Sequence, residues 1–381
     1  MSPTKEKEVL VMHFSLDQKI FHENIQNVQR AMASHTTLPI LTGILITAKG
    51  NTITLTATDL EIGIESKTEG TIFEEGSIVI PGQYLSSIIR ELPSEDVSFK
   101  IDEDFNVEIN CSSSHFKIKG YDSEEFPALP EVKEGLVVSF EQSLFKKMID
   151  EVKFAASNDE NQPFLNGALL IIHKGGGLEL AATNLYRLAS RWISIPTFDD
   201  INEDLKKIIP LKTLHELSRL LQKEEEEKIV ITIKENHILF SFSTLSINSR
   251  LKEGQFPNFK HVIPESFNCH CLINRQNLLN AVRRTSLIAK ENFNTLNFSF
   301  RKGEVEIKTI ASPIGLAREI VTGKFSGPEI EIAFTADYIV DVLRAIEQDL
   351  ISISMVNEKS ACIIRGFEDQ HYTYLVMPMQ V

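Results

Sequence analysis

The sequence has no long hydrophobic run. No apolar stretch approaches the ~20 residues that a membrane-spanning helix needs, although 42% of the 381 residues are hydrophobic. Residues 1–11 alternate in charge at Lys5-Glu6-Lys7-Glu8 and lack the apolar core of a signal peptide. We therefore expect several buried cores, no membrane anchor and a cytoplasmic location.

Cysteine is scarce. The chain has four cysteines, Cys111, Cys269, Cys271 and Cys362, too few for a disulfide framework at this length, and they predict reduced thiols. The sequence Cys269-His270-Cys271 lacks C-x-x-C spacing and a second pair nearby, so alternation along a strand is favoured over a metal site.

Catalytic motifs are missing as well. There is no nucleophile elbow and no Walker loop, and Gly175-Gly176-Gly177 is typical of a hairpin turn. Asp102–Asn106 resembles the start of a calcium loop, but Val107 stands where Gly is required and Ser113 where Glu is required, which indicates a turn between strands. The acidic run Glu224–Glu227 is interpreted as a solvated loop. The sequence thus predicts no metal, no cofactor and no enzyme.

What the sequence does contain is a threefold repeat. A helix with an apolar stripe recurs at intervals of 129 and 125 residues, each time after a β-rich run and a residue suited to a helix start. The stripes are Leu85, Ile88, Ile89 and Leu92 after Pro81; Leu214, Leu217 and Leu221 after Pro210; and Ile339, Val342, Leu343 and Ile346 after Thr335. An earlier helix in each repeat follows a short extended segment and carries Phe21, Ile25, Val28 and Met32; Phe145, Met148, Ile149 and Val152; or Leu278, Ala281, Val282 and Thr285.

Strand-like elements complete each repeat. Thr54–Leu60 matches Leu178–Leu185, Glu306–Ser312 is a weaker third copy, and a Phe-Pro pair recurs at Phe126 and Phe256. We predict an α+β fold of three similar domains, each with two helices packed against β-sheets, over residues 12–135, 136–264 and 265–381, with 1–11 as an N-terminal extension. Three unrelated α+β domains with similar stripes are the alternative.

The chain also lacks an excess of positive charge. Its net charge of −14 argues against nucleic-acid binding over the whole surface. The helices, expected over 15–34, 82–92, 140–157, 211–223, 274–291 and 336–347, nevertheless carry 14 basic and 11 acidic residues, against 25 and 42 elsewhere. Such segregation would let one surface hold DNA while the others repel it; ordinary solvated helix faces are the alternative.

Several segments, taken in order, resemble bacterial DNA polymerase III beta subunits, the beta sliding clamps. They are Thr37–Leu41, Ala57–Glu61, Leu165–Gly167, Ala182–Leu188, Gly254–Pro257 and Tyr374–Val381. The resemblance covers the chain from Met12 on, and its order and spacing make it specific. It implies the DNA clamp fold and a head-to-tail homodimeric ring around double-stranded DNA, with helices inside and sheets outside. The ring would slide without reading sequence and give the polymerase processivity.

The resemblance further implies a peptide-binding pocket between the second and third domains. The DNA polymerase III catalytic subunit, the clamp loader and other repair and replication proteins would dock short motifs in this apolar groove. The matching positions are Leu165, Thr183, Leu185, Tyr186, Arg187, Leu188, Pro257, Val262, Tyr338, Leu375, Val376, Met377, Pro378 and Met379. Arg187 is expected to hold a carbonyl or carboxylate of the peptide, and the methionines to close over its apolar anchors.

Basic residues off the apolar stripes are the candidates for DNA contact. They are Arg30, Lys147, Lys153, Arg219, Lys223, Arg283, Arg284 and Lys290. The chain departs from the family where Leu185-Tyr186 replaces the usual Gly-His, which predicts a bulkier pocket wall and a different motif preference. Its end is Gln380-Val381 rather than Arg-Leu, and His35 occupies a loop position that can be basic.

From the residues alone, two other functions stay open. One is a monomeric repeat scaffold that binds peptides but not DNA, and the other is an enzyme with an unrecognised site. A mass near twice 43.0 kDa in solution would favour the ring over the scaffold.

The first prediction concerns residues 1–11. Because the first repeat's pattern begins at His13, deleting Met1–Val11 should leave the melting temperature and the dimer mass unchanged. Thermal unfolding and light scattering on the shortened chain check this. A drop of several degrees would mean that the segment packs on the rest of the protein.

Overall fold

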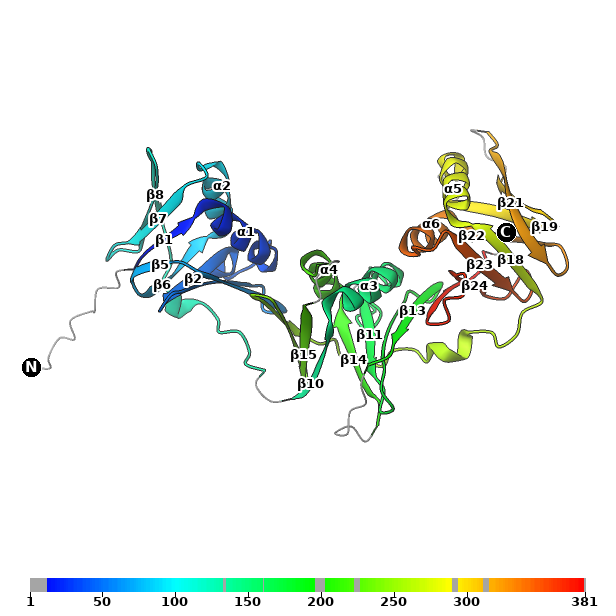
Figure 1. The fold of residues 1–381 in the computed structure, drawn as a ribbon, viewed down its shortest axis with the longest axis horizontal. Helices are drawn as coiled ribbons and strands as arrows, with labels where there is room; N and C mark the ends of the chain where they lie inside the picture. The colour runs from blue at the N-terminus through cyan, green and yellow to red at the C-terminus, as the bar shows by residue number, and fades with distance from the viewer. Residues whose placement is uncertain are drawn as a thin grey trace, which may run out of the picture. The chain divides into compact units, whose positions relative to one another are not determined.

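The structure is a computed structural model that describes residues 12–132, 135–159, 161–195, 203–222, 227–289, 294–310 and 315–379. The described residues within 1–143 and 219–250 form one compact unit, unit 1, and those within 144–218 and 251–381 form another, unit 2. The middle repeat contributes to both units (Figure 1). The expected N-terminal extension, residues 1–11, lies outside the described residues.

All six expected helices are present. They are α1 (Gln18–Val28), α2 (Gly82–Glu91), α3 (Gln142–Val152), α4 (Leu211–Leu220), α5 (Arg275–Ala289) and α6 (Ala336–Ala345). Each starts directly after a strand, which confirms the extended segments predicted before them. Most are shorter than predicted because strand residues precede them and because 3₁₀ turns at Gln29–Ala31 and Lys153–Ala155 follow α1 and α3.

Unit 1 holds two antiparallel sheets. The first has the order β5 (Thr71–Glu74), β1 (His13–Asp17), β7 (Asp96–Ile101), β8 (Asn106–Cys111), β9 (Ser114–Lys119). The second has the order β10 (Leu136–Glu141), β15 (Lys228–Lys234), β16 (His237–Phe242), β17 (Leu245–Arg250), β4 (Ile62–Glu69), β3 (Thr52–Thr58), β2 (Gly43–Lys49), β6 (Gly76–Pro81). Helices α1 and α2 contact each other. Phe21 of α1 packs against Phe14 of β1 and Phe99 of β7, and the three ring centroids are 4.9 to 6.0 Å apart.

Unit 2 is built on one 12-stranded sheet. Its order is β14 (Leu205–Pro210), β11 (Gly167–Ile172), β12 (Leu178–Thr183), β13 (Arg187–Ile193), β25 (Tyr372–Val376), β24 (Cys362–Gly366), β23 (Leu350–Met355), β18 (Cys269–Asn274), β21 (Arg318–Ser326), β20 (Glu304–Thr309), β19 (Thr295–Arg301), β22 (Ile330–Thr335). Helices α5 and α6 lie side by side in this unit (Figure 1).

Two strand pairs join successive repeats. In unit 1, β4 pairs with β17 so that Gly63 lies opposite Asn248. In unit 2, β13 pairs with β25 so that Leu188 lies opposite Leu375. Each pair closes two sheet edges that would otherwise expose unpaired backbone groups.

Two motifs predicted to be turns lie between strands. Asp102 lies in the turn between β7 and β8, where its carboxylate accepts hydrogen bonds from the backbone N–H groups of Asp104 and Asn106, each at 3.0 Å. The segment Gly175–Gly177 connects β11 to β12. The run Glu224–Glu227 lies, except for its last residue, outside the described residues.

The cysteines are buried and unpaired with one another. Cys269 and Cys271 alternate with an exposed His270 along β18, as the sequence predicted. Burial raises the pKa of the Cys271 thiol to about 12, which keeps it protonated and unreactive. Within the described ranges, no cluster of three or more His, Cys, Asp or Glu side chains could hold a metal ion, and none of the helices combines the length and hydrophobicity needed to span a bilayer.

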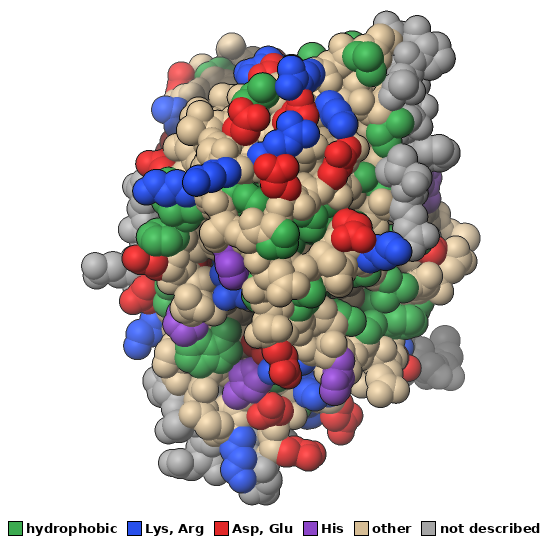
Figure 2. All heavy atoms as spheres, turned by 90° about the vertical axis from the view of Figure 1, so that its right-hand side faces the viewer, with side chains coloured by type: hydrophobic (Ala, Val, Ile, Leu, Met, Phe, Trp, Pro, Cys, Tyr) green, Lys and Arg blue, Asp and Glu red, His purple; other side chains and the backbone are tan. Residues whose placement is uncertain are grey.

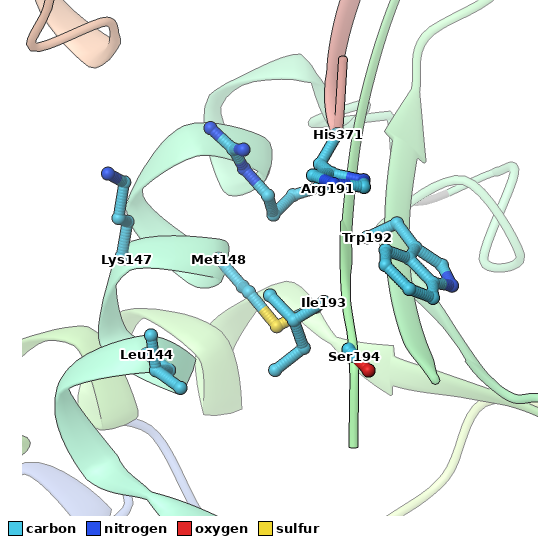
Figure 3. Close-up of a pocket in the computed structure, with 8 residues that line it drawn as sticks. All are labelled: Leu144, Lys147, Met148, Arg191, Trp192, Ile193, Ser194 and His371. Carbon is cyan, nitrogen blue, oxygen red and sulfur yellow. The ribbon is translucent and has the colours of Figure 1, made fainter. Parts of the chain in front are cut away.

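A buried ion network stands at the end of the β13–β25 pair. The guanidinium of Arg191 donates to Glu151 on α3 and to both carboxylate oxygens of Asp369, at 2.8 and 2.9 Å. The side chains of Arg191 and Glu151 are 8% and 3% exposed. Beside this network, α3 and the end of β13 line an open pocket of about 380 Å³, into which Met148 and Ile193 project (Figure 3).

Two of these groups titrate outside their usual range. Burial raises the pKa of Glu151, although Arg191 opposes that shift. Burial also pushes the pKa of Asp369 upward, but hydrogen bonds from Arg191 and from the backbone of His371 and Tyr372 outweigh it, so the Asp369 pKa is lowered. The ionised Asp369 therefore stabilises the fold above its unfolded pKa of about 3.9, and this contribution is lost as the pH falls through the lower folded value.

We predict that Asp369→Asn lowers the free energy of unfolding at pH 7 by about 2 kcal/mol, because Arg191 loses one of its two buried partners. The difference from the unsubstituted chain should shrink as the pH falls below about 4. Urea unfolding at pH 7 and at about pH 3 measures both quantities, with the exposed-turn variant Glu358→Gln as the control. A difference that does not change with pH would contradict the assignment.

Candidate peptide-binding groove

The C-terminal strand lies beside the segment that sequence analysis paired with it. Strand β25 is hydrogen-bonded along β13, with Arg187 opposite Val376 and Leu188 opposite Leu375. Beyond the strand, the N–H of Met377 donates to the carbonyl of Tyr186 at 2.8 Å, and the N–H of Met379 donates to the carbonyl of Ala333 at 2.8 Å. The tail is thus held by its backbone, which leaves both methionine side chains partly exposed.

A tight turn from Thr183 to Arg187 forms the rim. The Thr183 hydroxyl donates to the Arg187 carbonyl at 2.7 Å and accepts from the N–H of Leu185 at 3.0 Å. The side chain of Asn184 accepts from the N–H groups of Tyr186 and Arg187 at 3.1 and 3.0 Å. Leu185 adopts a φ of 74°, a conformation that a branched side chain rarely takes without such support.

This turn directs the two departures from the family pattern into solvent. Leu185 is 58% exposed and Tyr186 is 63% exposed. Both side chains lie outside the buried core, and the bulkier pocket wall expected from Leu185-Tyr186 stays a prediction.

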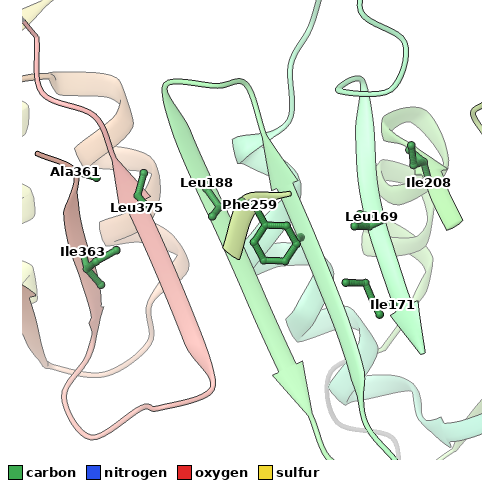
Figure 4. Packing of buried hydrophobic residues seen from close by; sticks show 9 residues of the cluster. Leu169, Ile171, Leu188, Ile208, Phe259, Ala361, Ile363 and Leu375 are labelled. Atoms are coloured by element: carbon green, nitrogen blue, oxygen red, sulfur yellow. The ribbon is translucent and has the colours of Figure 1, made fainter. Parts of the chain in front are cut away.

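An apolar cluster lies beneath the predicted groove. Leu188, Phe259, Ile363 and Leu375 belong to one buried cluster that β13, the linker before β18 and the C-terminal strands build together (Figure 4). Phe256 and Ile263 pack against its margin. We name this surface, bounded by Thr183–Leu188, Phe256–Ile263 and Leu375–Met379, the tail groove.

The remaining predicted residues take different positions around the tail groove. Leu165 and Val376 are buried, and Pro257 is half-buried. Val262 is 53% exposed because residues Phe259–Val262 form a 3₁₀ turn that carries its side chain outward. Tyr338, on α6, is half-buried, and its hydroxyl accepts a hydrogen bond from the side-chain amide of Asn184 at 3.2 Å.

Arg187 is engaged within the chain. Its Nη1 donates to Asp341 at 2.7 Å and its Nη2 donates to the carbonyl of Phe154. The guanidinium lies between two rings, 4.4 Å from the centroid of Tyr338 and 5.5 Å from that of Phe154. The Nη1 and Nη2 groups of Arg187, which the sequence predicted to bind a peptide, thus hold α6 and η4 (Lys153–Ala155) against β13.

The sequence did not identify Asp341, Phe154 and Phe259 as residues of this site. Nothing in the sequence pairs the first two with Arg187, because Asp341 belongs to the next repeat and Phe154 lies 33 residues away within the same one. A signal for Phe259 existed, since it follows the second Phe-Pro pair at the spacing at which Leu129 follows the first.

The candidates for DNA contact differ in how far their charge is already paired. Lys147 lies 3.4 Å from Glu347, and Lys153 lies 2.5 Å from Asp150 and also bonds Ser218. Arg284 forms a bidentate ion pair with Glu319, in which Nε and Nη2 each lie 2.8 Å from a carboxylate oxygen. These three cations are partly neutralised by neighbouring acids.

Two candidates keep a more open position. Arg30 and Arg283 are exposed, and no described side chain forms an ion pair with Arg283. Arg219 contacts the carbonyl of Asn27 at 3.4 Å. Lys223 and Lys290 lie outside the described residues.

Comparison with known proteins decides the family. The N-terminal, central and C-terminal domain models of the DNA polymerase III beta subunit match residues 12–130, 139–258 and 260–380. The chain belongs to the DNA polymerase III beta subunit family. Members of this family are DNA sliding clamps of polymerase III, and the chain is accordingly a non-catalytic clamp of DNA replication.

Individual relatives agree over nearly the full length. The beta sliding clamp of Halalkalibacterium halodurans is 31% identical over 97% of this chain and 100% of its own. The crystal structure of the Bacillus subtilis clamp has a TM-score of 0.91 at 30% identity, covering 97% of this chain and 99% of its own. A Bartonella birtlesii clamp solved with griselimycin has a TM-score of 0.92 at 27% identity, covering 97% and 100%.

Proposed function

We propose that two copies of this chain close head to tail into a ring around double-stranded DNA. In this ring the first domain of one copy meets the third domain of the other. We assign these domains to residues 12–135, 136–264 and 265–381, and place the protein in the cytoplasm with the DNA on which it acts. The ring would slide because its helices attract phosphates without reading bases.

Exposed apolar side chains support the contact between copies. Phe116 on the edge strand β9 is 38% exposed, and Leu287 on α5 and Ile320 on β21 are 66% and 48% exposed. On the face of the molecule seen in Figure 2, acidic and basic side chains lie among exposed hydrophobic ones. A mass near twice 43.0 kDa in solution supports the ring, whereas a monomer contradicts it.

The tail groove is the proposed docking site for the polymerase catalytic subunit, the clamp loader and other replication and repair proteins. The buried cluster with Leu188, Phe259 and Leu375 supports this surface from beneath, and Met377 and Met379, each 37% exposed, can repack around the hydrophobic anchors of a short peptide. Because Arg187 is held by Asp341, we propose that it keeps Tyr338 in place beside the groove. Peptide binding through Arg187 would require it to exchange one of these partners.

Arg283 is the sharpest test of the DNA surface. Arg283→Glu should weaken DNA association and reduce the slope of log affinity against log salt by about 1, the value for one lost phosphate contact. Arg284→Glu is less informative, because it would place a second carboxylate beside Glu319. Affinity for short duplexes across a salt series measures the effect.

The control for Arg283→Glu is Lys359→Glu, which makes the same charge change in the turn between β23 and β24. The control should bind DNA like the unsubstituted chain. An unchanged salt slope for Arg283→Glu would remove that residue from the DNA surface, and sharp sequence preference in footprinting would contradict sliding.

Removing Met377–Val381 should abolish binding of a polymerase-derived clamp-binding peptide, since a few anchors usually carry most of the binding energy. Titration gives the affinity and light scattering gives the mass. Removal of Gln380 and Val381 alone should leave both unchanged. Retained affinity in the longer deletion would contradict the site, and a monomer mass would mean that the tail supports the fold of the third domain.

If the longer deletion is monomeric, the point variants Met377→Ala and Met379→Ala replace it. Both side chains are 37% exposed, so their truncation leaves the backbone hydrogen bonds of the tail in place. Loss of peptide affinity in a dimeric variant supports the groove, and full affinity in both contradicts it.

A further inference from the structure

Unit 1 contains a counterpart of the tail groove. The Thr58 hydroxyl donates to the Ile62 carbonyl at 2.9 Å and accepts from the N–H of Leu60 at 3.0 Å. The Asp59 carboxylate accepts from the N–H groups of Glu61 and Ile62, both at 2.9 Å. Leu60 has a φ of 76°, so this turn reproduces the Thr183–Arg187 turn in residue types, bonds and backbone angle.

The strand beside this turn is also equivalent. Strand β17 runs along β4 as β25 runs along β13, and the N–H of its last residue, Arg250, donates to the Glu61 carbonyl at 2.9 Å. The bond from Met377 to Tyr186 is its counterpart. By this register, Gly63 and Asn248 occupy the positions that Leu188 and Leu375 hold in the tail groove.

In unit 1 the chain itself fills the groove. Phe126 and Val132 are each 8% exposed, and Leu129 between them is half-buried, whereas Ala128, Pro130 and Glu131 face solvent. Inward side chains at every third residue are what an extended polyproline-type segment presents to a surface. Residues 126–132 thus lie in unit 1 as a docked peptide would.

Two contacts anchor the middle of this segment. Leu129 lies over Gly63, where an added Cβ would stand 2.3 Å from the Leu129 Cδ2. The Leu129 side chain can therefore pack here only because residue 63 has no side chain. The side chain of Asn248 donates to the Pro130 carbonyl at 2.5 Å. Cavities of about 110 and 490 Å³ are lined by Pro127–Pro130 and Asn248, so the segment rests on the sheet and is not packed into a solid core.

The same spacing recurs in unit 2 with a different result. Phe256, Phe259 and Val262 match Phe126, Leu129 and Val132. Phe259 is buried, but the 3₁₀ turn at Phe259–Val262 leaves Val262 53% exposed, against 8% for Val132. The third apolar residue of the pattern is therefore buried in unit 1, as Val132, and exposed in unit 2, as Val262.

We propose that the groove of unit 1, bounded by Thr58–Gly63 and Arg250, is a second peptide-binding groove whose occupant is the chain's own segment 126–132. Its ligand class is an extended apolar peptide with hydrophobic anchors three residues apart. A tethered ligand acts at an effective concentration in the millimolar range, so it excludes weaker peptides in solution. This proposal rests on contacts within unit 1 and does not depend on peptide docking at the tail groove.

The test uses a fluorescent synthetic peptide that copies residues 123–132. It is titrated into the full chain, into Leu129→Ser and into the matched control Ala128→Ser, which changes an exposed residue of the same segment. We expect the probe to bind Leu129→Ser at least tenfold more tightly than the other two. A probe carrying the same Leu-to-Ser change should bind none of them.

Gly63→Leu supplies an independent readout. Its side chain takes the seat of Leu129, so hydrogen exchange should accelerate at residues 126–132 and stay unchanged at 256–263, without any gain in probe binding. Leu129→Ser combined with removal of Met377–Val381 should bind the probe as tightly as Leu129→Ser alone, which separates this groove from the tail groove. Equal probe affinity in Leu129→Ser and the unsubstituted chain, or unchanged exchange in Gly63→Leu, would overturn the proposal.

Discussion

The antiparallel pairing of β13 with β25 is the interaction on which the architecture of unit 2 depends. It turns the sheets of two repeats into one and places the C-terminal tail beside a turn nearly two hundred residues earlier in the chain. Two arginines reinforce the seam, one at the start of β13 and one near its end. Arg187 binds Asp341 and Arg191 binds Asp369, and both acids come from the third repeat. Since both guanidinium groups are about nine-tenths buried, removing either acid would leave a buried positive charge short of a partner.

Periodic patterns in the sequence were sufficient for the elements and the repeat. Most residues of the stripes through Phe21, Leu85 and Leu278 are buried, and each helix starts after a strand, as predicted. Local rules succeed here because a helix or strand buries the face that its own spacing defines. Helix ends were less accurate, since the change from strand to helix at Asp17 depends on a capping hydrogen bond and not on hydrophobic spacing.

The candidate site was predictable only in part. Family motifs brought Thr183, Leu188 and Leu375 together, and the strand register agrees with that grouping. The family motifs gave no indication that the Arg187 guanidinium hydrogen-bonds to both Asp341 and Phe154. Asp341 is separated from Arg187 by 154 positions in the sequence, and Phe154 by 33. Pairing of charged groups over such separations is a property of the folded chain, and a pattern along the sequence does not contain it.

The paired turns at Thr58–Ile62 and Thr183–Arg187 have an evolutionary consequence. Every bond that shapes them involves either the backbone or the short side chains of the Thr-Asx pair. The next two residues, Leu60-Glu61 and Leu185-Tyr186, contribute nothing to that scaffold through their side chains and point outward. Substitutions at Leu60-Glu61 or Leu185-Tyr186 can therefore change the outer surface of each turn during evolution while the backbone of the turn folds as before.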